Sequence, residues 1–155
     1  MFLEEHLLLC SEEQICEFAD GIHALAPSRA SEVTEIIENL FVGGLADASA
    51  GFDGLIICVL ADRPADEPAN MIWIPFLAQG AASLDKTAQA IDNALSDGRR
   101  VLVHCGAGSE RAPLTVAWFL NRRRAMSLDA AYALLKRKRP IVQDRSFWLR
   151  RYLGQ

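Results

Sequence analysis

A cysteine and an arginine with five residues between them form the part of the sequence best suited to chemistry. Cys105 follows a short apolar run, and Arg111 opens a segment with helical spacing. Gly106 and Gly108 lie between them, and glycine permits a tight turn in which several backbone N–H groups converge on one anion. A thiol, an anion cradle and a planar guanidinium are the parts required to transfer a phosphoryl group to sulfur.

The same arrangement predicts an unusually acidic thiol. The helix expected from about Ala112 directs the positive end of its dipole at the loop. Helix N-termini and nearby cations lower the pKa of cysteine thiols. We therefore expect the pKa of Cys105 to lie below its ordinary range, which suits a nucleophile.

Strands and helices alternate along the chain and must position this loop. Continuous apolar runs of strand length predict buried strands, and apolar residues at helical spacing predict helices. The expected strands are 38–44, 55–60, 71–74 and 101–104, and the expected helices are 11–26, 83–97 capped by Ser83, 112–124, 127–139 and a last one capped by Asp144. The predicted fold class is α/β, with a small, mostly parallel central sheet flanked by helices. Ligands bind such sheets at the carboxyl ends of the strands, where Cys105 lies.

Length and composition indicate one globular domain. The 155 residues are 51% hydrophobic and 23% charged, and we expect a single domain over 1–155 with a helical extension of unknown role at 1–35. No apolar run approaches the roughly 20 residues that cross a bilayer, and the first residues lack the features of a signal peptide. Four cysteines without a Cys-x-x-Cys pair favour neither a disulfide framework nor a structural zinc site. We therefore expect a cytoplasmic location.

Charge is distributed unevenly between the two halves of the chain. Residues 1–70 hold 14 Asp and Glu against 2 Lys and Arg, whereas residues 71–155 hold 6 against 14. A basic half can attract a phosphate ester or a nucleic acid. No aromatic platform or known nucleic-acid module accompanies the charge, which argues against nucleic-acid binding.

The segment 101–111, Val-Leu-Val-His-Cys-Gly-Ala-Gly-Ser-Glu-Arg, resembles the signature loop of the cysteine-based protein tyrosine phosphatases, specifically the small dual-specificity phosphatases. The resemblance extends over about 36–153, including the strand 72–76 and the Arg139–Pro140 pair. It implies hydrolysis of phosphotyrosine, phosphoserine and phosphothreonine in proteins or peptides through a phosphocysteine intermediate, with no cofactor or metal.

The resemblance also implies roles for individual residues. Cys105 would be the nucleophile, and Arg111 would bind the phosphate and stabilise the transition state. His104 would lie behind the thiolate and tune it, or be an ordinary buried core histidine. The backbone amides that would bind phosphate belong to Gly106, Ala107, Gly108, Ser109, Glu110 and Arg111.

Two positions depart from the family pattern. Relatives usually carry an aspartate, the general acid, a few residues after the Ile-Pro element, but residues 76–80 contain no carboxylate. Relatives also usually have Ser or Thr directly after the arginine, and this chain has Ala112. Either change would slow turnover, because a positioned acid commonly contributes about 10²–10⁴-fold.

Three carboxylates are candidates for the missing acid. Glu110 precedes the arginine, where myotubularin-like lipid phosphatases and some bacterial tyrosine phosphatases carry an aspartate; its alternative role is to stabilise the first turn of a helix. Asp85 follows the altered loop, and helix stabilisation behind Ser83 is its alternative. Asp62 ends the 55–60 strand. Catalysis without any acid is the fourth possibility.

Other functions remain open on the sequence. A phosphoinositide is the main rival substrate, suggested by Glu110 and the basic C-terminal half. A pseudophosphatase would bind phosphorylated partners with little turnover, as Ala112 and the altered acid loop suggest. A rhodanese-like sulfurtransferase also uses a cysteine in an anion-binding loop, but the His104–Cys105 pair argues against it.

Overall fold

The computed structural model describes residues 33–49, 51–76 and 80–154. The expected helix at 11–26 and the rest of the extension before residue 33 lie outside these ranges. The elements in chain order are β1 (Thr34–Ile37), β2 (Leu40–Gly43), α4 (Leu45–Ser49), β3 (Leu55–Cys58), β4 (Met71–Trp73), α5 (Ala82–Ser96), β5 (Val101–His104), α6 (Arg111–Arg124), α7 (Leu128–Lys138) and α8 (Ser146–Tyr152).

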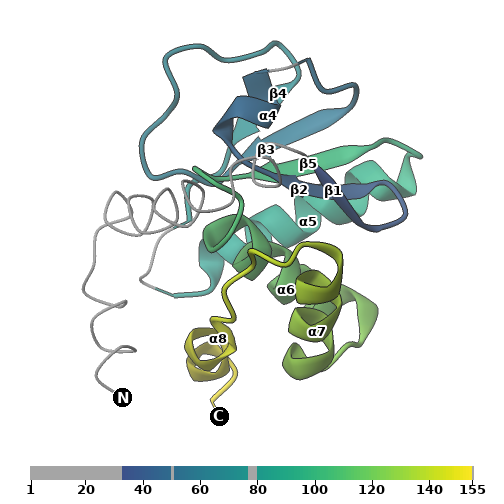
Figure 1. Cartoon of the computed structure of the whole chain (residues 1–155), viewed down its shortest axis with the longest axis vertical. Coiled ribbons are helices and arrows are strands. Elements are labelled where there is room, and N and C mark those ends of the chain that lie inside the picture. The colour runs from purple at the N-terminus through teal and green to yellow at the C-terminus, as the bar shows by residue number, and fades with distance from the viewer. Residues whose placement is uncertain (1–32, 50, 77–79, 155) are drawn as a thin grey trace.

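The strands form one sheet in the order β1-β2-β5-β3-β4. β1 pairs antiparallel with β2, and the other neighbours are parallel. The short helix α4 lies on one face of the sheet, and α5 and α6 cover the other, with α7 and α8 beyond α6 (Figure 1). The predicted α/β class with a mostly parallel sheet is confirmed.

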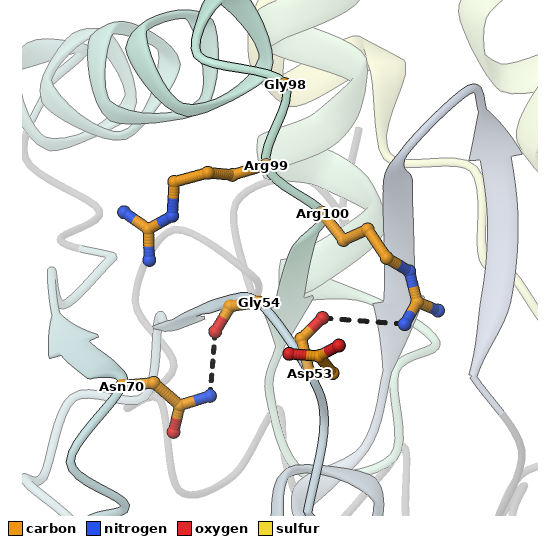
Figure 2. Close-up of a pocket in the computed structure, with 6 residues that line it drawn as sticks. All are labelled: Asp53, Gly54, Asn70, Gly98, Arg99 and Arg100. Carbon is orange, nitrogen blue, oxygen red and sulfur yellow. Dashed lines mark hydrogen bonds between the residues drawn. The ribbon is translucent and has the colours of Figure 1, made fainter.

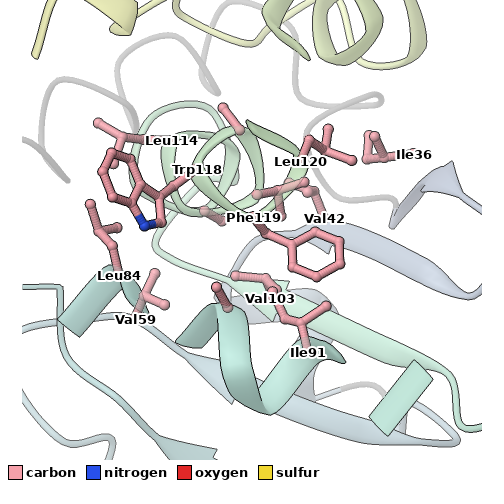
Figure 3. Close-up of a cluster of buried hydrophobic side chains, with 14 of the residues drawn as sticks. Ile36, Val42, Val59, Leu84, Ile91, Val103, Leu114, Trp118, Phe119 and Leu120 are labelled. Atoms are coloured by element: carbon pink, nitrogen blue, oxygen red, sulfur yellow. The ribbon is translucent and has the colours of Figure 1, made fainter. Parts of the chain in front are cut away.

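Side chains alternate across the sheet and build two buried layers. Along β5, Val101 and Val103 join the large cluster under α5 and α6, while Leu102 joins a smaller cluster on the α4 face. The strands β2 and β3 alternate in the same way. Figure 3 shows Trp118 and Phe119 of α6 pointing into the large cluster, toward Leu84 and Ile91 of α5 and Val103 of β5. Because β5 is central and α6 is packed on several sides, the turn between them has fixed ends.

Helix ends follow the sequence signals only in part. Ser127 caps α7 as expected, because its hydroxyl accepts from Ala130 N at 3.1 Å. The prediction that Ser83 caps α5 is wrong, since that helix begins at Ala82 and Ser83 lies in its first turn. Asp144 accepts from Ser146 N at 2.9 Å at the start of α8.

Across the described parts of the chain, no helix combines the length and apolar character needed to span a membrane.

A hairpin replaces the single strand expected at 38–44. Asn39 takes a positive φ of 67° at the turn, and its N–H donates to the Glu35 carboxylate at 3.0 Å. β1 has only four residues and alternates weakly between polar and apolar positions. That pattern is too short to be recognised from the sequence.

The interior and the edge of the sheet allow a matched stability test. Ile57 is fully buried in the interior strand β3, whereas its register partner Ile72 on the edge strand β4 is 39% exposed. We expect Ile57→Ala to lower the free energy of unfolding by about 2–5 kcal/mol, because it removes packed methyl groups and leaves a cavity. Ile72→Ala should cost less than about 1 kcal/mol. Urea denaturation of both variants measures the difference, and equal losses would contradict the packing described.

Candidate functional site

The loop from Cys105 to Arg111 connects the end of β5 to the start of α6. It lies at the carboxyl edge of the parallel strands, as the sequence predicted. Cys105 and Arg111 are each 2% exposed, so thiol and guanidinium are both held inside the loop region and not on the open surface. The structure therefore brings the two main candidate residues into one buried turn.

Every backbone carbonyl from residue 104 to residue 110 accepts a hydrogen bond, and six of the seven donor groups lie outside these residues. The donors, in chain order, are Val59 N (3.1 Å), His104 Nδ1 (3.2 Å), Leu45 N (2.8 Å), Arg139 Nη2 (3.1 Å), Arg139 Nε (2.8 Å), Gln143 N (2.8 Å) and Leu114 N (3.0 Å). Since the C=O and N–H of a trans peptide point in opposite directions, outward carbonyls direct the amides inward. The amides form a cradle suited to an anion.

The sulfur of Cys105 sits among these amides. Ala112 N donates to Cys105 Sγ at 3.4 Å. The amides of Gly108, Glu110 and Arg111 also act on the thiol and lower its pKa. An anion at this place would meet the same donors.

Two glycines let neighbouring segments approach the loop. Gly108 has φ of +69°, and a Cβ there would lie 2.6 Å from the Gly43 carbonyl oxygen. A Cβ on Gly44 would lie 2.7 Å from the Gly106 carbonyl oxygen. Larger side chains at either position would force the turn away from β2, so the amides could no longer converge.

The predicted acidity of Cys105 is wrong. Burial is the largest influence on the thiol and raises its pKa above the ordinary value, because a thiolate loses hydration in the packed loop. The amides of Ala112, Gly108, Glu110 and Arg111 oppose burial without overcoming it. The thiolate fraction in the unliganded loop is therefore smaller than the motif suggested.

His104 lies behind the loop and is fully buried. A carbonyl can only accept, so the 3.2 Å contact between His104 Nδ1 and the Cys105 oxygen makes Nδ1 the protonated ring nitrogen. Burial lowers the pKa of His104, while the nearby Asp47 carboxylate raises it to a smaller extent. A neutral ring thus fixes the carbonyl next to the sulfur.

Glu110 is paired with an arginine from the connection between α7 and α8. Arg145 Nη2 donates to Glu110 Oε1, and the side chains are 16% and 3% exposed. Burial raises the pKa of Glu110, and the charge and hydrogen bond of Arg145 oppose that rise. The other oxygen, Oε2, is buried and has no hydrogen-bond partner within the described ranges.

The other two acid candidates have different surroundings. Asp85 lies in the first turn of α5, where its Oδ1 accepts from Trp118 Nε1 at 2.8 Å. Asp62 is exposed in the turn that follows β3. Only Glu110 of the three is part of the cradle itself.

Three residues that hold the loop were missed by the sequence analysis. Arg139 directly follows the last residue of α7, is 2% exposed, and donates to two loop carbonyls and to Thr34 Oγ1 at 2.9 Å. Gln143 and Arg145 contact the loop from the same segment. The one available signal was Pro140, which ends the helix and sets Arg139 apart from the exposed cations before it.

A cavity of about 480 Å³ lies at the opposite edge of the sheet, where β3 and β5 begin. Figure 2 shows the guanidinium of Arg99 over this cavity, while Arg100 turns away and donates to the Asp53 carbonyl at 3.4 Å. The Arg100 guanidinium is also stacked on the rings of Phe41 and Phe52. This cavity is separate from the cradle around Cys105.

Comparison with known proteins places the loop in a family context. The family described as "Dual specificity phosphatase, catalytic domain" matches residues 56–152, which contain the whole loop and the segment that holds it. Dual specificity phosphatase 28 of Mus musculus is 29% identical over 122 residues, covering 70% of this chain and 75% of that protein. A protein of Invertebrate iridescent virus 6 named as a tyrosine phosphatase, 123R, is 30% identical over 119 residues, covering 72% of this chain and 82% of that protein.

Solved structures share the fold. The crystal structure of human DUSP28 superposes with a TM-score of 0.66 at 22% identity, covering 79% of this chain and 90% of that one. A human tyrosine phosphatase-like serine/threonine/tyrosine-interacting protein gives a TM-score of 0.62 at 19% identity, covering 80% and 95%. The family match, the curated relatives and the fold agree, and the chain belongs to the dual specificity phosphatases, a family of cysteine-based protein phosphatases.

Proposed function

We propose that this chain hydrolyses phosphotyrosine, phosphoserine and phosphothreonine through a covalent phosphocysteine at Cys105. The observation that carries the proposal is the outward direction of all seven loop carbonyls, which leaves the amides around Sγ free to bind the phosphate oxygens. Arg111 adds a guanidinium that can contact two oxygens at once.

The reaction has two steps. In the first, the Cys105 thiolate attacks phosphorus, the ester P–O bond breaks, and the leaving oxygen takes a proton from a general acid. In the second, water attacks phosphorus and gives a proton back to that acid, the P–S bond breaks with Cys105 leaving as the thiolate, and inorganic phosphate departs. The amides and Arg111 stabilise the negative charge on the equatorial oxygens in both steps.

Glu110 is the proposed general acid. Burial raises its pKa, which favours the protonated form that an acid needs at the start of the reaction. It also directly precedes Arg111. Asp85 remains the alternative donor, although its carboxylate already accepts a hydrogen bond from Trp118.

A second candidate function is binding of phosphorylated proteins with little turnover. Ala112 is fully buried and donates its amide to Sγ, but its methyl group cannot supply the hydroxyl that relatives carry there. A burst of one dephosphorylated leaving group per protein, with the phosphate retained on Cys105 and almost none released afterwards, would favour this function. Steady release from phosphotyrosine and phosphoserine peptides favours the phosphatase, and preferential release from a phosphoinositide would move the substrate class to lipids.

Cys105→Ser should abolish hydrolysis while leaving binding of inorganic phosphate largely intact. The hydroxyl is a far poorer nucleophile at neutral pH, whereas the amides and Arg111 stay in place. Phosphate release from a peptide substrate and titration with inorganic phosphate, on the parent and the variant, measure the two properties. Turnover by the serine variant, or a requirement of the parent for a divalent metal, would contradict the mechanism.

Arg111→Lys should reduce kcat/KM on the order of 10²-fold or more, comparable to the loss of an oxyanion donor. Lysine keeps the charge but cannot make a two-pronged contact to the phosphate. Arg122→Lys is a suitable control, since Arg122 lies at the far end of the same helix over the Trp118 ring. A loss below about threefold for Arg111→Lys would show that this guanidinium does not hold the phosphate.

Glu110→Gln should reduce hydrolysis of a phosphoserine peptide far more than that of p-nitrophenyl phosphate, because an alkoxide needs a proton and nitrophenolate does not. Loss of the acid should also remove the fall in rate at high pH. Asp85→Asn is the matched comparison, measured on both substrates across pH. If Asp85→Asn and not Glu110→Gln has the leaving-group effect, the assignment of the acid is wrong.

A further inference from the structure

Arg145 is a partly buried cation that no step of the proposed mechanism uses. It lies between α7 and α8, and its Nη2 donates to Oε1 of Glu110, which is 35 residues away in the sequence. The side chains are 16% and 3% exposed. Removing one member of this pair leaves the other charged group without its partner in surroundings of low polarity. The loss therefore costs more than the loss of one member of an exposed surface pair.

We propose that Arg145 is a positioning residue, which holds Oε1 of Glu110, leaves Oε2 as the oxygen that carries the transferable proton, and sets the pH range over which that proton is present. This inference rests on the proposed role of Glu110 as the general acid. It adds a residue outside the signature loop to the machinery of the reaction.

The first support is the hydrogen-bonding capacity of the two groups. A guanidinium can only donate, so the carboxyl oxygen that it contacts must accept, whether Glu110 is ionised or neutral. A carbonyl oxygen is a better acceptor than a hydroxyl oxygen, so a neutral carboxyl group that keeps this bond to Arg145 favours the proton on Oε2. That oxygen is buried and has no hydrogen-bond partner in the described parts of the chain.

The second support is that the backbone of the loop is held by other contacts. Arg139 donates to the carbonyls of residues 107 and 108, and Gln143 N donates to that of Ser109 at 2.8 Å. Arg145, from the same segment, reaches a titratable side chain. Its contact is therefore suited to controlling a proton, while the neighbouring contacts hold the turn.

The charges around Glu110 support the same direction. Burial raises the pKa of Glu110, and Arg145 is the group that opposes it by charge and hydrogen bond. On α7, Tyr132 is fully buried, and burial raises its pKa, so it stays neutral at working pH. Asp144 acts on Tyr132 together with Glu110 and Arg145, and Arg111 is the next residue in the chain after Glu110. Loss of the charge of Arg145 should therefore leave Glu110 protonated up to a higher pH.

Arg145→Gln tests this, because glutamine keeps an N–H donor and removes the charge. We expect the basic limb of the kcat/KM profile to move to higher pH. We also expect the plateau value of kcat/KM for a phosphoserine peptide to fall on the order of tenfold. This is less than the full contribution of a positioned acid, because Glu110 is still present but is no longer held in place. Arg145→Lys keeps the charge, so its basic limb should stay near that of the parent.

Arg150→Gln is the matched control, since Arg150 lies on α8 and pairs with the exposed carboxylate of Asp129. This variant should change neither the basic limb nor the plateau of the kcat/KM profile. In a Glu110→Gln background, Arg145→Gln should have no further effect on the pH profile.

The outcomes separate the inference from the proposed function. A folded Arg145→Gln variant with an unmoved basic limb would overturn the role of Arg145, whatever the loss of rate. If Arg145→Gln does not fold, as judged by its urea midpoint, a shifted limb in Arg145→Lys would overturn it instead. If Glu110→Gln shows no leaving-group effect, the proposed acid fails first, and Arg145 then has no proton to position.

Discussion

The outward direction of the loop carbonyls is the constraint on which the rest of the site depends. A turn this tight can present its amides to an anion only if each carbonyl finds a donor elsewhere, because buried polar groups without partners are costly. The donors come from the segment that follows β2, from the end of β3, from α6 and from residues 139–143. The sheet and the helices α6 to α8 are thus arranged around one backbone requirement, and the reactive side chains occupy the space that it creates.

Burial raises the pKa of both titrating groups of the proposed mechanism, with opposite consequences for the reaction. A raised pKa of Glu110 suits a proton donor, whereas a raised pKa of Cys105 disfavours the thiolate. The amides that contact Sγ lower the pKa of the thiol and oppose this second effect without overcoming it.

Much of the fold and the centre of the site could be predicted, because their signals are local. Apolar runs mark β3 and β5, and the Cys105–Arg111 spacing with its glycines marks the cradle. The partners Arg139 and Arg145 could not be predicted, since they meet the loop across 31 to 35 residues of sequence. The pKa of Cys105 was expected to fall because the helix and the cations are visible in the sequence. Burial is not visible there, and it decides the sign.

The support that residues 139–145 give to the loop also has a consequence for how the protein is made. A chain emerges from the ribosome with its N-terminal part first, and domains begin to fold in that order. All five strands and the whole signature loop precede residue 112, so the sheet can form while the loop carbonyls of residues 107–109 still lack Arg139 and Gln143. The anion cradle therefore gains its full set of donors only after residues 139–143 have been made and have packed on the loop.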